Sequence, residues 1–450
     1  MRRLIALITA LLGAGPLAGA ATLCVNASRA PCHATIQAAV LAAGSADTVA
    51  IAPGLYLENV TIPPGRDGLR LIGSGPHATV IDPDVPNAGT GVRIESNGVE
   101  VAALGIRNGQ QYGVAIAAGV QRVHVHDLRF IGVRGPSAIF AEPGARRLRI
   151  VSNDIRASGS IGIHLSGANE GSIVRANVVR QVDQAVVALG NDLDILANRV
   201  IGAKTVGLQV GGTRVRVADN VVERVAATGM DVAGNELVVR NNQLTNAGTL
   251  SVRCTGCTRG VVGWNSVNAS RDNGFTLAAD APGLEVRKNA ARVAVLSGFE
   301  IRGRGVHLID NVATDAGTFP AYPVYGCFVV LGEGHHLERN FATRCTPSGY
   351  VVRADDVELA DNVSTEATTS GFLVYTAVFT DLSVGNVLTR NRALDSNAAG
   401  FAVSDKAQAT RLSGNVGSGN RYDFCDDGIG TDLSGGNTFA TTSTVCDVLL

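Results

Sequence analysis

Polar and charged side chains recur at one position of a repeating pattern in the middle of the chain. They are His164, Gln209, Asp231, Arg253 and Glu300, with Arg302 two residues beyond the last. Guanidinium groups bind carboxylates through paired hydrogen bonds, so Arg253 is expected to be the central cation of a binding groove. We predict that these residues bind an extended chain of sugars. The alternative is a solvated strand face in which Asp231 and Arg253 form a surface ion pair worth less than about 1 kcal/mol.

Two reactions that cleave polysaccharides require different catalytic groups among these residues. Glycoside hydrolysis needs two carboxyl groups roughly 5–9.5 Å apart. Asp231 and Glu300 are three repeats apart, which corresponds to about 14 Å and is too far. β-Elimination at a uronate needs a base for the C5 proton and a cation such as Ca²⁺ on the carboxylate. Arg253 and Lys204 are the candidate catalytic residues for elimination, although arginine normally stays protonated and Lys204 also fits a plain surface loop.

A second set of residues has the chemistry of metal ligands. Glu285, His307, His336 and Glu358 stand four residues before successive asparagines of the repeat, and Glu338 is adjacent. Imidazole and carboxylate groups bind divalent metals such as Zn²⁺. The alternative is a ladder of alternating charges that stabilises stacked strands without a metal.

The elements that position these residues follow from a repeat of the chain. From residue 91 onward, blocks open on a small residue, and most steps between blocks are 22–25 residues. Inside the blocks an asparagine recurs between apolar residues. The series is Asn153, Asn177, Asn198, Asn220, Asn242, Asn265, Asn289, Asn311, Asn340, Asn362, Asn391 and Asn415.

This repeat predicts a coil of short strands. Each block holds three short segments with period-2 alternation, and stacking them on their copies in neighbouring blocks pairs the backbone and buries a core. Asparagine suits the turn between the second and third strands because it tolerates the left-handed conformation, and stacked asparagines can bond one another. A leucine-rich repeat would need denser leucine, and a propeller blade would need about 40 residues.

The start of the mature chain resembles a known family. Thr35–Val40, followed by Pro53-Gly54, Tyr56 and Glu58, resembles the entry segment of secreted right-handed parallel β-helix proteins of the pectate-lyase-like superfamily. The resemblance implies an all-β, single-stranded, right-handed parallel β-helix (solenoid) of about 14 regular coils with N- and C-terminal caps. It also implies a short helix within residues 34–43.

The same resemblance implies a function. In that family, saccharide lies along the outer face of the first strand column, so the expected ligand is an acidic polysaccharide that is bound and cleaved by lyase-like β-elimination. The alternative is a non-catalytic surface, adhesion or carbohydrate-binding module. Aromatic residues make up only 4% of the chain. Only Phe140, Phe328 and Tyr375 are expected to face outward on the first strands, which counts against stacking on neutral sugars.

The N-terminal segment of the sequence predicts export. Arg2-Arg3, an apolar run and Ala18-Gly19-Ala20 predict a signal peptide over residues 1–20 and a secreted or periplasmic protein. We expect the N-terminal cap and first coils over 21–90, regular repeats over 91–404 and a C-terminal cap over 405–450. No later stretch is expected to span a membrane. With 38 basic and 39 acidic residues, the chain lacks the basic character expected of a nucleic-acid-binding protein.

Eight cysteines fit an oxidising compartment. We expect disulfides between Cys24 and Cys32 and between Cys425 and Cys446, which would hold the two ends of the chain in place. Cys254 and Cys257 are expected to form a structural disulfide, because no second cysteine pair completes a zinc site. The pairing of Cys327 and Cys345 stays open.

Overall fold

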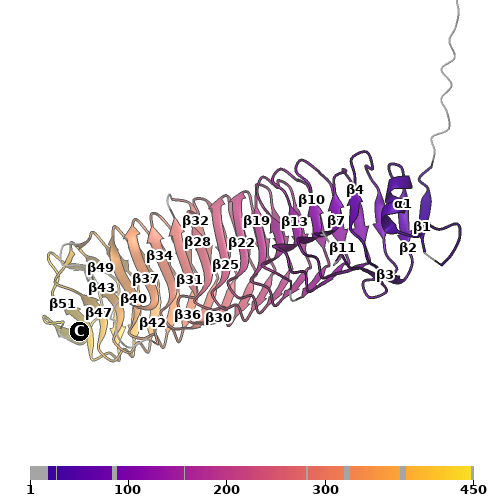
Figure 1. The fold of residues 1–450 in the computed structure, drawn as a ribbon. Helices are drawn as coiled ribbons and strands as arrows, with labels where there is room; N and C mark the ends of the chain where they lie inside the picture. Colours follow the sequence, from indigo (N-terminus) through magenta and orange to yellow (C-terminus); the bar gives the residue numbers. More distant parts are fainter. Residues whose placement is uncertain are drawn as a thin grey trace, which may run out of the picture.

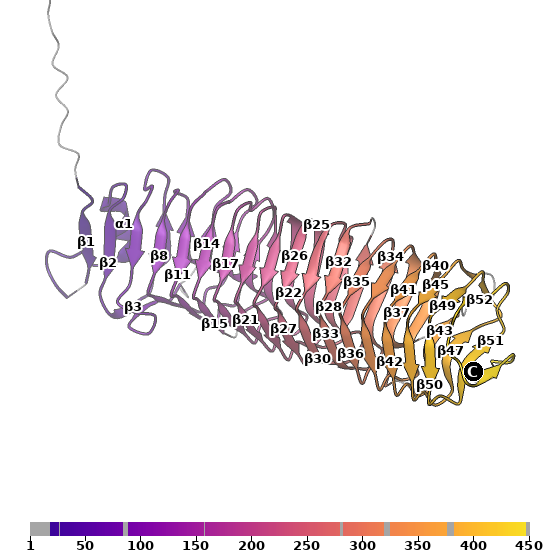
Figure 2. The ribbon, with the colours of Figure 1, turned by 180° about the vertical axis from the view of Figure 1, so that it is seen from behind.

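The chain winds into a right-handed parallel β-helix of about 17 turns, which confirms the predicted fold and lies close to the predicted number of about 14 regular coils with caps. The computed structural model describes residues 19–26, 28–83, 89–156, 158–279, 282–318, 325–375 and 382–446. Figures 1 and 2 show the turns stacked along one axis, with helix α1 (Ile36–Ala42) at one end and strand β51 (Tyr422–Asp426) at the other. The predicted signal peptide lies almost wholly outside the described residues and stays a prediction.

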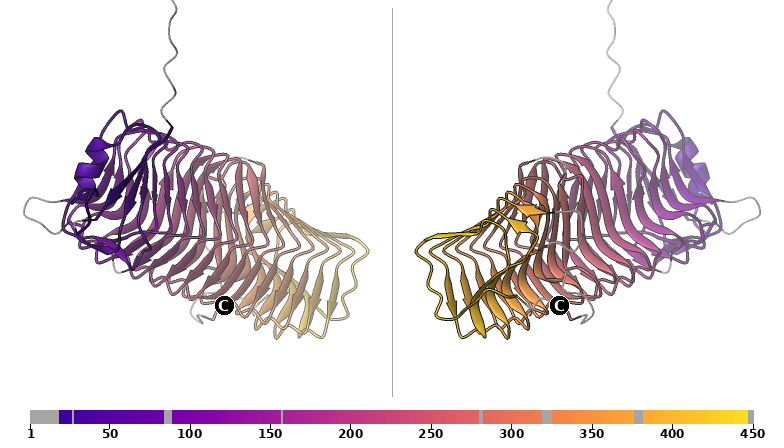
Figure 3. Two further views of the ribbon diagram at one scale, coloured as in Figure 1. Left: turned by 90° about the vertical axis from the view of Figure 1, so that its right-hand side faces the viewer. Right: turned by 90° about the vertical axis from the view of Figure 1, so that its left-hand side faces the viewer.

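Each turn contributes one strand to each of three parallel sheets. In one turn these are β13 (Ser137–Ala141), β14 (Arg149–Val151) and β15 (Asp154–Arg156), and each pairs with the equivalent strand of the next turn. We call the sheets that contain β13, β14 and β15 the first, second and third sheet. Figure 3 shows the stack from both ends. Side chains alternate along each strand, so one face of every sheet points into the core and the other points outward.

The first sheet carries the row of residues for which the sequence predicts polysaccharide binding. Its described strands, in order along the axis, are β4 (Val60–Ile62), β7 (Thr90–Ile94), β10 (Tyr112–Ile116), β13, β16 (Ile161–Leu165), β19 (Gln184–Leu189), β22 (Val206–Thr213), β25 (Thr228–Asn235), β28 (Leu250–Thr255), β31 (Phe275–Ala279), β34 (Ser297–Gly303), β37 (Gly326–Glu333), β40 (Ser348–Asp355), β43 (Ser370–Val374), β47 (Ala399–Val403), β51 and β53 (Thr442–Ser443).

The other two sheets run the same length. The second sheet extends from β1 (Thr22–Val25) to β52 (Asp432–Gly435), and the third from β3 (Gly54–Tyr56) to β50 (Val416–Ser418). Both expected end regions therefore contribute strands to the stack. The domain boundaries themselves stay predictions.

Helix α1 packs on the N-terminal turns. The Thr35 hydroxyl accepts a hydrogen bond from the amide of Ala38, which caps the helix, and Ile36, Ala39 and Val40 are buried. The Glu58 carboxylate accepts bonds from the amides of Ile36 and Gln37, at 2.8 and 2.9 Å. A carboxylate is favourable at this end of a helix, because the free amides there carry partial positive charge. The short helix expected within 34–43 is confirmed.

A ladder of buried asparagines joins the turns, and it includes all twelve residues of the predicted series. At Asn220, Nδ2 donates to Asn242 Oδ1 at 2.9 Å and to the Ile195 carbonyl at 2.9 Å. The Asn220 Oδ1 accepts from the side chain and the backbone amide of Asn198. Each side-chain amide is thereby fully satisfied. Asn437 extends the ladder by one further turn.

The asparagines of the ladder do not adopt the left-handed conformation, so the prediction that tolerance of this conformation explains their position is wrong. The left-handed conformation belongs to the residue before each asparagine, with φ at 60° for Asp219 and 55° for Asn241. Asparagine is required for its side-chain hydrogen bonds in a buried column, because an unpaired polar group there is costly.

Replacing Asn220 by alanine is expected to lower the free energy of unfolding by about 1–3 kcal/mol, because it leaves buried groups of Asn198 and Ile195 unsatisfied. Urea denaturation followed by circular dichroism measures the change. The control is Asn268→Ala, which removes an exposed asparagine side chain from a strand in a nearby coil of the β-helix. Equal stability of the two variants would show that the ladder contributes nothing measurable.

Aromatic rings form a second ladder inside the core. Six rings stack nearly parallel on successive turns at centroid distances of 4.6–5.0 Å: Phe275, Phe299, Phe328, Tyr350, Phe372 and Phe401. The prediction that Phe328 faces outward is wrong. Phe328 pairs with Phe299 and Tyr350 in the sheet and is fully buried, and Val329 takes the outward position.

Four disulfides lie in the described residues. Cys24–Cys32, Cys254–Cys257 and Cys425–Cys446 confirm the predicted pairs, and Cys327–Cys345 forms the fourth. Such bonds are typical of proteins from oxidising compartments, such as the cell exterior or the periplasm. Separately, the described part of the chain contains no helix that is both long and apolar enough to cross a membrane.

Candidate functional site

The backbone register places the predicted row on one line across the first sheet. His164 on β16 is followed on successive strands by Val187, Gln209, Asp231, Arg253, Thr276 and Glu300. Arg302 lies two residues beyond Glu300 on the same outer face of β34. The row spans six strand spacings, or about 29 Å. The structure therefore lines these side chains up along one face. Asp231 and Arg253 form an ion pair in the middle of the row, and further side chains gather at its two ends.

A cleft lies at the C-terminal end of the row. It has a volume of about 610 Å³ and opens over β28, β31, β34, β37 and β40. Of the predicted residues, Glu300 and Arg302 line it. Its other polar walls include side chains that the sequence did not single out, namely Asp272, Asn273, Thr276, Tyr325 and Arg353.

Glu300 is held in place in the wall of this cleft. Only 7% of the residue is exposed. Asn273 Nδ2 donates to Glu300 Oε2 at 3.0 Å, and Arg302 Nε donates to Oε1. Asn273 is itself held, because its Oδ1 accepts from the Ser297 amide at 3.0 Å. These bonds position the Glu300 carboxylate and supply two polar partners for its negative charge.

Asp272 places a second carboxyl group in the cleft. It lies in the turn between β30 (Ser266–Ser270) and β31, and it is half-buried. Burial raises the pKa of the Asp272 carboxyl, and the negative charge of Glu300 raises it further. The Asn273 amide and Arg302 act in the opposite direction, but the net direction is upward. The cleft thus holds one carboxyl that keeps its proton to higher pH than an ordinary aspartate, a pattern typical of catalytic acid–base groups.

Two arginines border these carboxyls. The register aligns Arg302 on β34 and Arg353 on β40 with Leu331 on the strand between them, so the two residues are two strand spacings, or about 10 Å, apart. The Arg353 Nε is buried and has no hydrogen-bond partner among the described residues. A buried donor without a partner is costly, and an anionic ligand in the cleft would satisfy it.

The two residues predicted to be catalytic lie outside the cleft walls. Arg253 Nε donates to Asp231 Oδ1 at 2.9 Å, and this bond raises the pKa of the guanidinium. A raised pKa opposes action as a base, because the group must lose its proton to act. Lys204 Nζ pairs with Asp183 Oδ1 at 2.8 Å, and its side chain is 74% exposed. Its surroundings are those of a surface loop.

The N-terminal end of the row has a different character. Phe140 stacks on Tyr112 with centroids 4.6 Å apart, and His164 packs against Phe140 at 5.3 Å. All three rings are only partly buried on the outer face. Burial lowers the pKa of His164, which favours the neutral ring. Aromatic faces of this kind pack against apolar faces of ligands.

The predicted metal ligands lie on the second sheet. Glu285, His307, His336 and Glu358 occupy one row across β32 (Leu284–Arg287), β35 (His307–Ile309), β38 (His336–Glu338) and β41 (Glu358–Ala360). Glu285 pairs with Arg287 at 2.9 Å. The donor atoms that converge belong to His307, His336 and Glu338.

Comparison with known proteins agrees with the fold. Residues 184–342 match the family model described as the right handed beta helix region, which confirms the resemblance stated for the sequence. No curated protein matches the chain in sequence.

Similar solved structures include enzymes that act on carbohydrates. The catalytic domain of a GH87 alpha-1,3-glucanase in complex with nigerose is 12% identical, with 90% of this chain and 70% of that chain covered and a TM-score of 0.39. DFA-IIIase from Arthrobacter chlorophenolicus A6 in complex with DFA-III is 12% identical, with 82% and 84% covered and a TM-score of 0.33. A pectin methylesterase in complex with a hexasaccharide is 12% identical, with 46% and 80% covered and a TM-score of 0.31.

Proposed function

We propose that the protein binds an acidic polysaccharide along the outer face of the first sheet and cleaves it in the cleft beside Glu300. The observation that carries this proposal is the pair of carboxyls, Asp272 and Glu300, bordered by Arg302 and Arg353 in one cleft. Guanidinium groups recognise carboxylates through paired hydrogen bonds. The raised pKa of Asp272 favours its role as a proton donor beside a second carboxyl group.

The chemistry that this arrangement favours is β-elimination at a uronate. In the proposed mechanism Arg302 and Arg353 bind the ligand carboxylate, which makes the neighbouring C5 proton easier to remove. Glu300 accepts that proton, and Asp272 protonates the glycosidic oxygen as its bond breaks. Glu300 and Asp272 thus replace Arg253 and Lys204 as the proposed catalytic residues. Arg253 remains a proposed binding residue along the row.

A panel of purified uronans and neutral glucans tests this function. Ultraviolet absorbance detects an unsaturated uronate product, and a reducing-end assay detects every cleavage. We expect both signals on at least one uronan. Reducing ends without the unsaturated product would indicate hydrolysis by the same carboxyl pair and would contradict elimination.

A non-catalytic binding module is the second candidate. The Asp231–Arg253 pair and the rings of Tyr112, Phe140 and His164 favour it, because they extend a contact surface well beyond the cleft. Such a protein would be retarded by a uronan in affinity electrophoresis and would release no product from it.

Replacing Arg353 by alanine is expected to weaken uronan binding by about 10–150-fold, the equivalent of roughly 1.5–3 kcal/mol for a hydrogen bond to a charged group. Affinity electrophoresis measures the change. The matched control is Arg175→Ala, which removes an exposed arginine from β17 (Ile173–Arg175) on the second sheet. We expect both variants to melt at nearly the wild-type temperature. Equal retardation of the two variants would exclude Arg353 from the binding site.

A further inference from the structure

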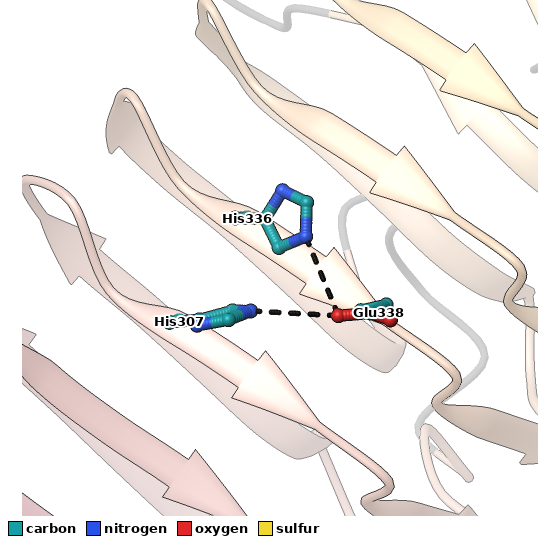
Figure 4. A group of neighbouring side chains, drawn as sticks. All are labelled: His307, His336 and Glu338. Carbon is teal, nitrogen blue, oxygen red and sulfur yellow. Dashed lines mark ion pairs between the residues drawn. The ribbon is translucent and has the colours of Figure 1, made fainter.

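Two histidines and a glutamate converge on the outer face of the second sheet, away from the cleft. His307 on β35 and His336 on β38 are direct neighbours in the sheet, and Glu338 lies on the same strand as His336. His307 Nε2 and His336 Nε2 lie 3.9 and 3.8 Å from Glu338 Oε2. Figure 4 shows both rings directed at this oxygen. One donor atom from each residue lies within 4.8 Å of the other two.

Neighbouring residues hold the donor atoms in an orientation that suits a ligand. His336 Nδ1 lies 3.0 Å from Glu358 Oε2, and a proton on Nδ1 leaves the lone pair on Nε2. A carboxylate behind a histidine in this way is the usual outer partner of a metal-bound imidazole. Arg339 binds the other oxygen of Glu338, so Oε2 is the oxygen left for a ligand.

The environment of His307 Nε2 favours a bound cation. Its Nε2 atom is buried and has no hydrogen-bond partner in the described part of the chain. Glu338 Oε2 lies 3.9 Å from it, which is too long for a hydrogen bond. A cation between the three donors would satisfy all of them.

We propose that His307, His336 and Glu338 bind a divalent first-row metal ion of the Zn²⁺ type, with Glu358 as the outer partner of His336. Tetrahedral zinc with bonds of about 2.1 Å places its ligand atoms about 3.4 Å apart. The two nitrogen–oxygen distances of 3.9 and 3.8 Å exceed this value by about half an ångström. The donor atoms of the two histidines lie within 4.8 Å of each other, so the side chains must close in by at most about 1.4 Å to bind the ion. The metal would tie two successive turns together, and its fourth position would face solvent. This site is independent of the proposed polysaccharide cleft.

The chain provides a matched control on the same sheet. His126 on β11 (His124–His126) also lies beside a histidine and a glutamate. Its Nδ1 is bonded to Asp127 at 2.7 Å and its Nε2 to Glu100 at 3.1 Å, so both nitrogens are engaged. Among the described residues, only His307, His336 and Glu338 bring three such donor atoms within 4.8 Å of one another.

Zinc titration of the full mature chain, freed of any histidine tag, tests the site. Isothermal calorimetry with zinc chloride should give one ion per wild-type chain and one per His126→Ala chain. Glu358→Gln should weaken binding by about 10–100-fold. His336→Ala and the milder His307→Gln should each lose the bound equivalent while keeping the wild-type circular dichroism spectrum. The visible spectrum of bound Co²⁺ should disappear in the same two variants. Wild-type chain that takes up no zinc, or zinc uptake unchanged in both folded variants, would overturn the proposal.

Discussion

Replacing Phe328 by alanine is expected to lower the free energy of unfolding by about 3–5 kcal/mol, the range for a fully buried aromatic side chain. The ring lies between Phe299 and Tyr350 at 5.0 and 4.8 Å and has no exposed surface. Its removal opens a cavity in the ladder of rings, because the backbone on both sides is fixed by strand pairing. Urea denaturation followed by circular dichroism gives the change in free energy.

Phe341→Ala is the control for this substitution. Phe341 begins β39 (Phe341–Thr343) on a neighbouring part of the third sheet, and 39% of it is exposed. Its loss should cost well under half as much, because less apolar area returns to water. If the two variants unfold at the same urea concentration, the buried ring of the aromatic ladder contributes no more to the free energy of unfolding than the partly exposed ring of Phe341.

Replacing Asp272 by asparagine is expected to slow uronan cleavage by about 10²–10⁴-fold, the usual contribution of a general acid. Uronan binding should persist, because Arg302 and Arg353 remain. The pKa of Asp272 is raised by burial and by Glu300, so its proton is lost as pH rises through that raised value. Wild-type cleavage should therefore fall on the alkaline side, and initial rates over a pH series measure both effects. A variant that keeps the wild-type rate would remove Asp272 from the mechanism.

The same pKa shift predicts a gain in stability for Asp272→Asn. A carboxyl whose pKa is higher in the folded chain than the ordinary 3.8 destabilises the fold once it is ionised. This penalty is absent below the unfolded value and fully present above the folded value. Asp272→Asn should therefore melt above wild type at neutral pH, with the difference vanishing in acid. Asp219→Asn, an exposed change outside the cleft, should show no such difference.

The row on the first sheet was predictable because two periodicities agree. Strand alternation fixes which side chains point outward, and a nearly constant block length fixes which of them are neighbours. The prediction fails at Phe328, because the sequence suggests Gly326 as the first residue of its block, whereas the sheet pairs Gly326 with Ser297 and aligns Cys327 with Gly298. A displacement of one residue exchanges the inner and outer faces, so Phe328 enters the core and Val329 faces outward.

The cleft was only partly predictable. Asp272 lies in a turn, where strand periodicity gives no information on direction, and its proximity to Glu300 depends on the path of that turn. Arg353 carried a usable signal, since it follows its row position, Val351, by two residues, just as Arg302 follows Glu300. Of the four residues predicted as metal ligands, His307 and His336 belong to the group that we propose as a metal site. Glu338, two residues along the strand from His336, takes the place of Glu285 in that group, since Glu285 is paired with Arg287.

A crystal structure of the protein with a bound acidic oligosaccharide tests the central claim most directly. The account predicts sugar density over Thr276 and Glu300 on the outer face of the first sheet. A uronate carboxylate should lie within hydrogen-bond distance of Arg302 or Arg353, and the bond to be cleaved should lie beside Asp272. Oligosaccharide bound on the second or third sheet, with the cleft filled only by water, would contradict it.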